Sequence, residues 1–134
     1  MPGPQTLRVV LVEDHQPYRE QLTHFLEDLG GVQIVHHAER SGDAVAWIRR
    51  NPQGWDLLVL DIFLAEGHGY QVLQACRQRD RHQHAVFLTS YTRDPARTQA
   101  LASGANAVFA KTEVQAFLDY VRQRRDALEL ASHP

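Results

Sequence analysis

Five short apolar runs, each followed by a segment with helical spacing, constrain the fold of this chain more than any other feature. Strict alternation of strand and helix with short connections is typical of a parallel sheet, because each right-handed crossover lays its helix on one face. We therefore expect a doubly wound α/β fold with a five-stranded parallel sheet, in the strand order 2-1-3-4-5 that is common for such sheets. The runs occupy residues 8–12, 32–35, 57–62, 85–88 and 107–110.

The third run is the densest of the five, and it leads into a carboxylate. Residues 57–60 are all apolar without alternation, which favours a central strand whose two faces are both covered. Asp61 follows directly, at the carboxyl end of the strand, where open α/β sheets bind their ligands. Position alone leaves two interpretations open: Asp61 belongs to a functional site, or it ends the strand and faces solvent.

Polar residues and one proline predict where three of the helices begin. Ser41 is placed as the N-cap of the second helix, and Asp94 with Pro95 as the N-cap and first turn of the fourth. Thr112, followed three residues later by Gln115, has the spacing of a capping box at the start of the last helix.

Length and composition limit the classes of protein to which the chain can belong. A chain of 134 residues is long enough for one domain and short for two, so we expect a single domain over residues 1–134 with its core at about 7–128. The formal net charge of −2 predicts no direct binding to nucleic acid or membrane. The N-terminus lacks a signal pattern, which predicts a cytoplasmic protein. The single cysteine, Cys76, is interpreted as a small core residue.

Four of the five runs lead into polar or charged residues, and these ends share one edge if the sheet is parallel. They are Glu13 with Asp14, Asp61, Thr89 and Lys111. Three carboxylates at one place repel each other unless positive charge intervenes. A divalent cation together with the Lys111 ammonium group makes such a site neutral. The alternative to a functional site is that polar residues merely follow the strands. In that case their identities would be arbitrary, whereas here they form a chemically coherent set.

The residue types at this edge predict which ion and which chemistry it serves. Carboxylates without histidine or cysteine favour a hard ion, and Mg²⁺ takes one or two carboxylates, several waters and a phosphate oxygen. We expect Mg²⁺, with Mn²⁺ as the alternative ion. A carboxylate can then attack phosphorus to give an aspartyl phosphate, while the ion and Lys111 neutralise the equatorial oxygens. Thr89 can donate a hydrogen bond to one of those oxygens.

The sequence resembles the receiver domain of two-component response regulators over nearly its whole length, because it carries the motifs of that family in the same order. The resemblance implies the flavodoxin-like (βα)5 fold and a phosphoacceptor role for Asp61, with phosphohistidine of a sensor histidine kinase or a histidine phosphotransfer protein as donor. The matching motifs are Val-Glu-Asp-His at 12–15, Leu-Asp-Ile at 60–62, Leu-Thr-Ser at 88–90, Gly-Ala at 104–105, and Lys111.

The resemblance also assigns roles to individual side chains. Asp14 and Asp61 are implied to coordinate Mg²⁺, with Glu13 acting mostly through bound water and the Phe63 backbone carbonyl completing the protein ligands. Thr89 and Lys111 are implied to contact the phosphoryl oxygens.

Three positions depart from the family pattern. The aromatic switch residue that receivers usually carry three positions before the lysine is Val108 here. Phe109 is adjacent, but neighbouring strand residues point to opposite faces, so Phe109 cannot simply replace it. The proline after the lysine is Thr112, and Leu64-Ala65 stands where Met-Pro is frequent. We expect intact phosphorylation chemistry with altered transmission of the signal.

Aromatic, histidine and arginine residues outside the motif carry weaker signals. Phe63 and Tyr91 are interpreted either as ordinary loop packing or as a shield that slows water attack on the aspartyl phosphate. The pairs His36-His37 and His82/His84 are interpreted as solvated turn residues rather than metal ligands, because they lack zinc spacing. The arginines late in the last helix are interpreted as a solvated helix end that suits the helix dipole; these are Arg122, Arg124 and Arg125.

The expected function is that of a signalling domain and not of a metabolic enzyme, although it assists its own phosphorylation and dephosphorylation. Since no second domain follows the last helix, output is expected through a downstream protein target or phosphorelay. A fragment of a larger DNA-binding response regulator would look the same at this length. The surface of the fourth and fifth helices with the fifth strand is the interaction face that the resemblance implies, and a homodimer through these two helices is one form of contact there. An aspartyl-phosphate-forming hydrolase is a further alternative, but it expects a second acid where Phe63 stands.

Overall fold

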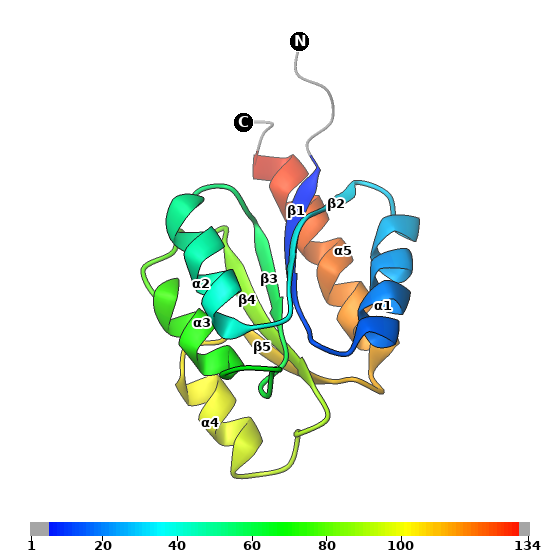
Figure 1. Ribbon diagram of the computed structural model, residues 1–134. Coiled ribbons are helices and arrows are strands. Elements are labelled where there is room, and N and C mark those ends of the chain that lie inside the picture. Colours follow the sequence, from blue (N-terminus) through cyan, green and yellow to red (C-terminus); the bar gives the residue numbers. More distant parts are fainter. Residues whose placement is uncertain (1–5, 132–134) are drawn as a thin grey trace.

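The computed structural model describes residues 6–131, and they form a single twisted parallel sheet wrapped by helices (Figure 1). The strand order is β2-β1-β3-β4-β5, with every neighbouring pair parallel. The predicted doubly wound fold is therefore confirmed. The strands are β1 (Leu7–Val12), β2 (Val32–Ala38), β3 (Leu57–Leu60), β4 (His84–Thr89) and β5 (Ala107–Ala110).

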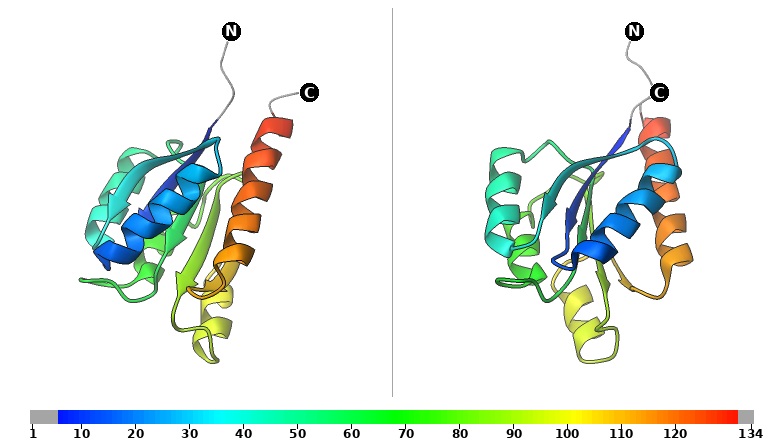
Figure 2. Two further views of the ribbon diagram at one scale, coloured as in Figure 1. Left: turned by 90° about the vertical axis from the view of Figure 1, so that its right-hand side faces the viewer. Right: turned by 45° about the vertical axis from the view of Figure 1, so that its right-hand side comes forward.

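Helices cover both faces of the sheet. α1 and α5 lie in front of one face, and α2, α3 and α4 lie against the other (Figures 1 and 2). Each right-handed crossover deposits one helix, so the alternation seen in the sequence becomes three layers. The helices are α1 (Gln16–Asp28), α2 (Ser41–Arg50), α3 (Gly69–Ala75), α4 (Ala96–Ala102) and α5 (Val114–Ala131).

The sheet divides the apolar core into two clusters, one on each face. Alternate residues of β3 enter different clusters: Leu58 and Leu60 pack beneath α2 and α3, whereas Leu57 and Val59 pack beneath α1 and α5. All four are buried, as the unbroken apolar run predicts. Burial of a side chain of this size stabilises a fold by about 1.5–3 kcal/mol, so the central strands anchor the edge to which Asp61 belongs.

Two predicted helix starts are wrong. Ser41 is the first residue of α2 and is buried, while Arg40 occupies the N-cap position without a side-chain hydrogen bond. At the start of α5, the Gln115 amide donates to Asp119 (3.0 Å) and not back to Thr112. The turn is instead closed by the carboxylate of Glu113, which accepts from the Ala110 amide (2.9 Å).

The start of α4 lies close to its prediction. Pro95 stands in the N-cap position and the helix begins at Ala96. Asp94 still acts as a side-chain cap, because its Oδ1 accepts from the Thr98 amide at 3.2 Å.

Of the four histidines interpreted as solvated turn residues, His82 lies in an exposed turn, as predicted, and the other three lie in strands. His36 and His37 lie in β2, and His84 begins β4. His36 stacks on Trp47 with ring centroids 5.0 Å apart. Burial lowers the pKa of His84 to about 4, with Arg124 contributing in the same direction, and its Nδ1 contacts the Tyr120 hydroxyl.

The end of α5 is more than a solvated surface, which corrects the interpretation of its arginines. Arg125 donates to the carbonyl oxygens of Leu29 (2.7 Å) and Gly30 (3.0 Å). These carbonyls end α1, so Arg125 joins the two helices of one face. Arg122 forms a surface ion pair with Asp119, closer to the expected solvated state.

Cys76 is buried in the apolar cluster beneath α2 and α3, which confirms it as a core residue. Within residues 6–131, no helix combines the length and the apolar character needed to cross a membrane.

Candidate functional site

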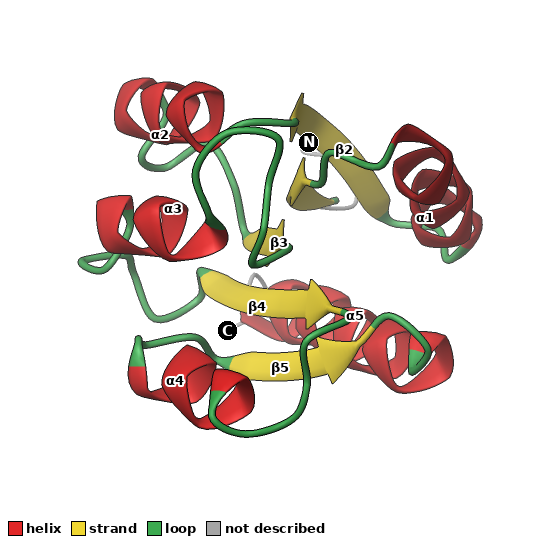
Figure 3. Cartoon of the chain, turned by 60° about the horizontal axis from the view of Figure 1, so that its bottom comes forward, coloured by secondary structure: helices red, strands yellow, loops and turns green. Residues whose placement is uncertain are grey.

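The carboxyl ends of the strands meet at one edge of the sheet, which Figure 3 turns toward the viewer. The parallel register pairs Val12 with Leu60, so the residues that follow these two strands are neighbours. The Asp61 amide continues this pairing by donating to the Val12 carbonyl (3.0 Å). On the other side, the Lys111 amide donates to the Thr89 carbonyl (3.0 Å), so β4 and β5 deliver these residues to the same edge.

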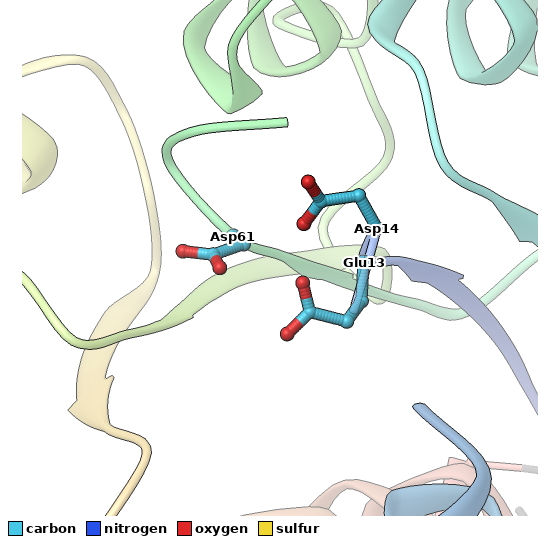
Figure 4. Close-up of side chains that lie close together, drawn as sticks. All are labelled: Glu13, Asp14 and Asp61. Atoms are coloured by element: carbon cyan, nitrogen blue, oxygen red, sulfur yellow. The ribbon is translucent and has the colours of Figure 1, made fainter. Parts of the chain in front are cut away.

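Three carboxylates gather there, as predicted. Glu13 and Asp14 come from the segment after β1 and Asp61 from the end of β3 (Figure 4). One carboxylate oxygen from each lies within 4.8 Å of the others. Glu13 and Asp61 are buried and Asp14 is exposed, so the cluster opens to solvent on one side. An all-oxygen donor set with this spacing fits a hard divalent cation such as Mg²⁺.

Lys111 brings positive charge to the cluster. Its Nζ lies 2.9 Å from Oδ2 of Asp61 and also contacts Oε1 of Glu13. Burial alone would lower the pKa of Lys111, but hydrogen bonds to these two carboxylates outweigh that effect and raise it. Burial raises the pKa of Glu13 against the opposing effect of Lys111. Lys111 is therefore held as a cation between two acids.

An aromatic ring lies against this lysine, and no motif in the sequence indicated a functional role for it. Lys111 Nζ lies 4.5 Å from the centroid of the Tyr18 ring, a cation–π distance. Burial raises the pKa of Tyr18 to about 12, so the phenol stays neutral. Tyr18 lies in α1, and helical spacing in the sequence cannot show that its ring reaches the lysine after β5.

The backbone around Asp61 fixes the direction of its carboxylate. The Ile62 amide donates to Oδ1 of Asp61 at 2.7 Å, which leaves Oδ2 for Lys111. The chain then passes close to Gly69, where an added Cβ would lie 2.3 Å from the Asp61 carbonyl oxygen. Gly69 is thus required by close approach of α3 to the end of β3.

Thr89 ends β4 and Phe63 lies in the loop after Asp61. Thr89 is fully buried at the end of β4, and its Oγ1 accepts from the Tyr91 amide (3.2 Å). Phe63 and Tyr91 are both more than half exposed, and their rings pack edge to face with centroids 4.6 Å apart. The loops after β3 and β4 therefore meet beside the site. The roles of Thr89 and of the Phe63 carbonyl stay predictions.

The departures from the family pattern have clear places in the fold. Val108 is buried in the cluster beneath α2 and α3, whereas Phe109 packs on Phe117 and Tyr120 on the opposite face. This confirms that Phe109 cannot stand in for an aromatic at position 108. Thr112 is exposed.

Comparisons with known proteins agree with the fold and the edge just described. The sequence profile of the response regulator receiver domain matches residues 9–122. The response regulator UvrY of Escherichia coli is 27% identical over 105 residues, which are 78% of this chain and 47% of UvrY. The DNA-binding transcriptional activator DevR/DosR of Mycobacterium tuberculosis is 30% identical over 105 residues, 78% of this chain and 48% of that protein. The chain spans about half the length of these curated relatives.

Among solved structures, the signal receiver domain of the Mycobacterium tuberculosis protein designated NarL has a TM-score of 0.74 and 28% identity. The match covers 89% of this chain and 98% of that domain. The family profile spans most of the chain. The observed strand order and the acidic cluster also agree with those expected from the resemblance to receiver domains. The chain belongs to the response regulator receiver domain family of two-component signalling proteins.

Proposed function

We propose that the chain is a phosphoacceptor domain that receives a phosphoryl group on Asp61 in a Mg²⁺-dependent reaction. The observation that carries this proposal is the pairing of Asp61 Oδ2 with Lys111 at 2.9 Å inside a cluster of three carboxylates. The contact with Lys111 and the hydrogen bond from the Ile62 amide fix the direction of the Asp61 carboxylate, as a nucleophile toward phosphorus requires. The phosphoryl donor is a phosphohistidine of a sensor histidine kinase or a histidine phosphotransfer protein.

Different residues of the site have different roles: some bind the cation, and others contact the phosphoryl group. Asp14 and Asp61 would hold the cation, Glu13 would act through bound water, and the Phe63 carbonyl would complete the protein ligands. Mg²⁺, or Mn²⁺ in its place, would supply positive charge for the phosphoryl oxygens. Lys111 would supply a second positive charge, and the Thr89 hydroxyl would donate a hydrogen bond to one of those oxygens. The P–N bond of the donor breaks as the bond from phosphorus to the Asp61 oxygen forms.

The output is proposed to be contact with a downstream protein rather than a metabolic reaction. We propose that residues 1–134 form one receiver domain that acts in the cytoplasm. Homodimerisation through α4 and α5 is one form such contact can take.

A second candidate function is the same phosphorylation within a larger DNA-binding regulator. The observation in its favour is that the chain spans about half of its relatives, one of which is described as a DNA-binding transcriptional activator. A hydrolase has less support, because the position two residues after Asp61 carries the apolar side chain of Phe63 and offers no general acid.

Incubation with acetyl phosphate and Mg²⁺, followed by intact mass spectrometry, tests the proposal. The expected result is the gain of one phosphoryl group, which Asp61→Asn and removal of Mg²⁺ both abolish. Asp43→Asn is the matched control, because Asp43 is an exposed acid of α2 outside the cluster. No gain by the wild type, or gain that survives Asp61→Asn, contradicts the proposal.

A further inference from the structure

Two adjoining hollows lie at the edge of the sheet opposite the acidic cluster. The first has a volume of about 250 Å³ and is formed where α2 and α3 end. The second has a volume of about 340 Å³ and lies between the α3–β4 and α4–β5 connections. Arg79 and Gln83 line both, so the two hollows adjoin at these residues. Gln83 directly precedes β4, which places them at the amino ends of the strands.

The first hollow has an apolar floor. Ile48, Trp55 and Cys76 line it, and all three belong to the apolar cluster beneath α2 and α3. Trp55 is 1% exposed, and its indole N–H has no acceptor among residues 6–131. A hollow of this kind can receive one large apolar side chain.

Arginines surround this floor and line the second hollow. Arg49, Arg77 and Arg81 are exposed, and none forms an ion pair within the described part of the chain. Arg79 is held in place by hydrogen bonds to the Gly104 carbonyl (2.7 Å) and to Asn106 Oδ1 (2.8 Å).

Few acids offset these four cations. Asp80 is the acid that lines the second hollow. Asp56, nearby, is buried and already paired with Arg8 at 3.1 Å. A chain with a net charge of −2 therefore carries a local excess of positive charge here, remote from the phosphorylation site, which we name the basic cleft: Ile48, Arg49, Trp55, Cys76, Arg77, Arg79 and Arg81.

We propose that the basic cleft binds an acidic segment of a partner protein, with one large apolar side chain seated beside Trp55 and carboxylates paired with Arg77 and Arg81. Charge complementarity argues for an anionic partner. The buried apolar floor argues for a peptide, because single-stranded nucleic acid is bound on exposed aromatic rings, and Trp55 is almost fully covered. The inference does not depend on phosphorylation of Asp61.

Fluorescence anisotropy with a labelled peptide of glutamate and leucine residues tests this inference on the whole chain at low salt. A peptide of the same length in which lysine replaces glutamate, an all-glutamate peptide and a single-stranded DNA oligonucleotide are the comparison probes. The expected order of affinity places the glutamate–leucine peptide first. Equal binding of the lysine peptide overturns the proposal, as does tighter binding of the DNA. Equal affinity of the all-glutamate peptide overturns the seating of an apolar side chain beside Trp55.

The double variant Arg77→Glu, Arg81→Glu locates the binding. Both side chains are exposed, so the fold is expected to persist, and thermal unfolding checks this. Affinity for the glutamate–leucine peptide is expected to fall by about tenfold, since two favourable charge pairs become repulsive. The matched control is Arg93→Glu, Arg97→Glu, which changes the same charge at exposed positions near α4. Equal affinities of the two double variants, or no binding of the peptide to the wild type, overturn the proposal. Phosphorylation by acetyl phosphate is expected to be normal in both variants.

Discussion

At the scale of single residues, the site depends on one cation shared by two acids. Lys111 contacts both Glu13 and Asp61, and Asp14 completes a cluster whose oxygens lie within 4.8 Å. Without the ammonium group, these carboxylates repel each other across a partly buried space. Lys111 and a divalent cation therefore neutralise the same negative charge. When Lys111 is removed, a bound cation is expected to stabilise the fold by a larger amount.

Lys111→Met is expected to lower the free energy of unfolding by about 2 kcal/mol without Mg²⁺, less than for a fully buried pair because the site is open on one side. Added Mg²⁺ is expected to raise the melting temperature more in this variant than in the wild type. Thermal unfolding with and without MgCl₂ measures both effects. Asp14→Asn is the control and is expected to reduce the Mg²⁺ effect. An equal Mg²⁺ shift in wild type and Lys111→Met contradicts the shared-charge account.

Gly69 tests how tightly the backbone is packed behind Asp61. In Gly69→Ala the new Cβ meets the Asp61 carbonyl oxygen at 2.3 Å and the Phe87 ring at 2.8 Å. The expected loss of stability is about 1–3 kcal/mol, measured by urea unfolding. Gly42→Ala is the control, because Gly42 lies in α2 with open space around it, and alanine there is expected to stabilise by about 0.5–1 kcal/mol. Equal effects of the two substitutions would mean that the close approach at Gly69 costs nothing.

At the scale of elements, the loops after β3 and β4 meet through the rings of Phe63 and Tyr91. Their centroids lie 4.6 Å apart, although the loops are distant in sequence. The Tyr91 amide also donates to Thr89 Oγ1, so the aromatic pair is tied to a proposed phosphoryl contact. This geometry favours the hypothesis that the pair limits access of water to the aspartyl phosphate.

Phe63→Ala combined with Tyr91→Ala is expected to speed phosphate release from the phosphorylated protein several-fold, because water gains access to the acyl phosphate. Release of inorganic phosphate after removal of the donor measures the rate. Phe25→Ala is the control, since Phe25 is a partly exposed aromatic on α1. Equal rates for the double variant and the wild type would assign the pair to loop packing alone.

The sequence predicted the elements better than it predicted their ends. Apolar runs and helical spacing identified all ten elements, because burial in strands and helices has a different period in each. Ser41 and Thr112 were wrong as caps: the N-cap of α2 is Arg40, whose side chain makes no capping bond, and Glu113 closes the turn before α5. The role of Arg125 at the end of α1 could not be predicted, because it joins residues about 95 positions apart and depends on how the helices pack.

The site shows the same division between local and long-range information. Parallel strand ends were enough to bring Glu13, Asp14 and Asp61 together, and the structure confirms their proximity. Tyr18 beneath Lys111 was missed, because cation–π contacts leave no spacing signal in a sequence. The ion pair between buried Asp56 and Arg8 was missed because it joins residues 48 positions apart in the sequence.

At the scale of the whole molecule, histidines of β2 and β4 make stability depend on pH. Burial lowers the pKa of His36 and His37 in β2, and it lowers that of His84 in β4 to about 4. Each is held neutral in the folded protein at a pH where the unfolded chain, with an ordinary pKa near 6.5, already binds a proton. Stability therefore falls as pH falls below about 6.5. The raised pKa of Glu13 acts in the opposite direction, which would partly hide the effect in the wild type.

A comparison of the wild type with His84→Gln separates the two effects, because Glu13 is common to both proteins. The glutamine is expected to keep a hydrogen bond to the Tyr120 hydroxyl but cannot take up a proton. Between about pH 7 and pH 5, the wild type is expected to lose stability relative to His84→Gln, since only the wild type must exclude a proton from position 84 on folding. Free energies of unfolding from urea titrations at the two pH values give the difference. A difference that stays constant with pH would mean that His84 is not held neutral, and that the contact joining β4 to α5 does not contribute to the acid sensitivity of the fold.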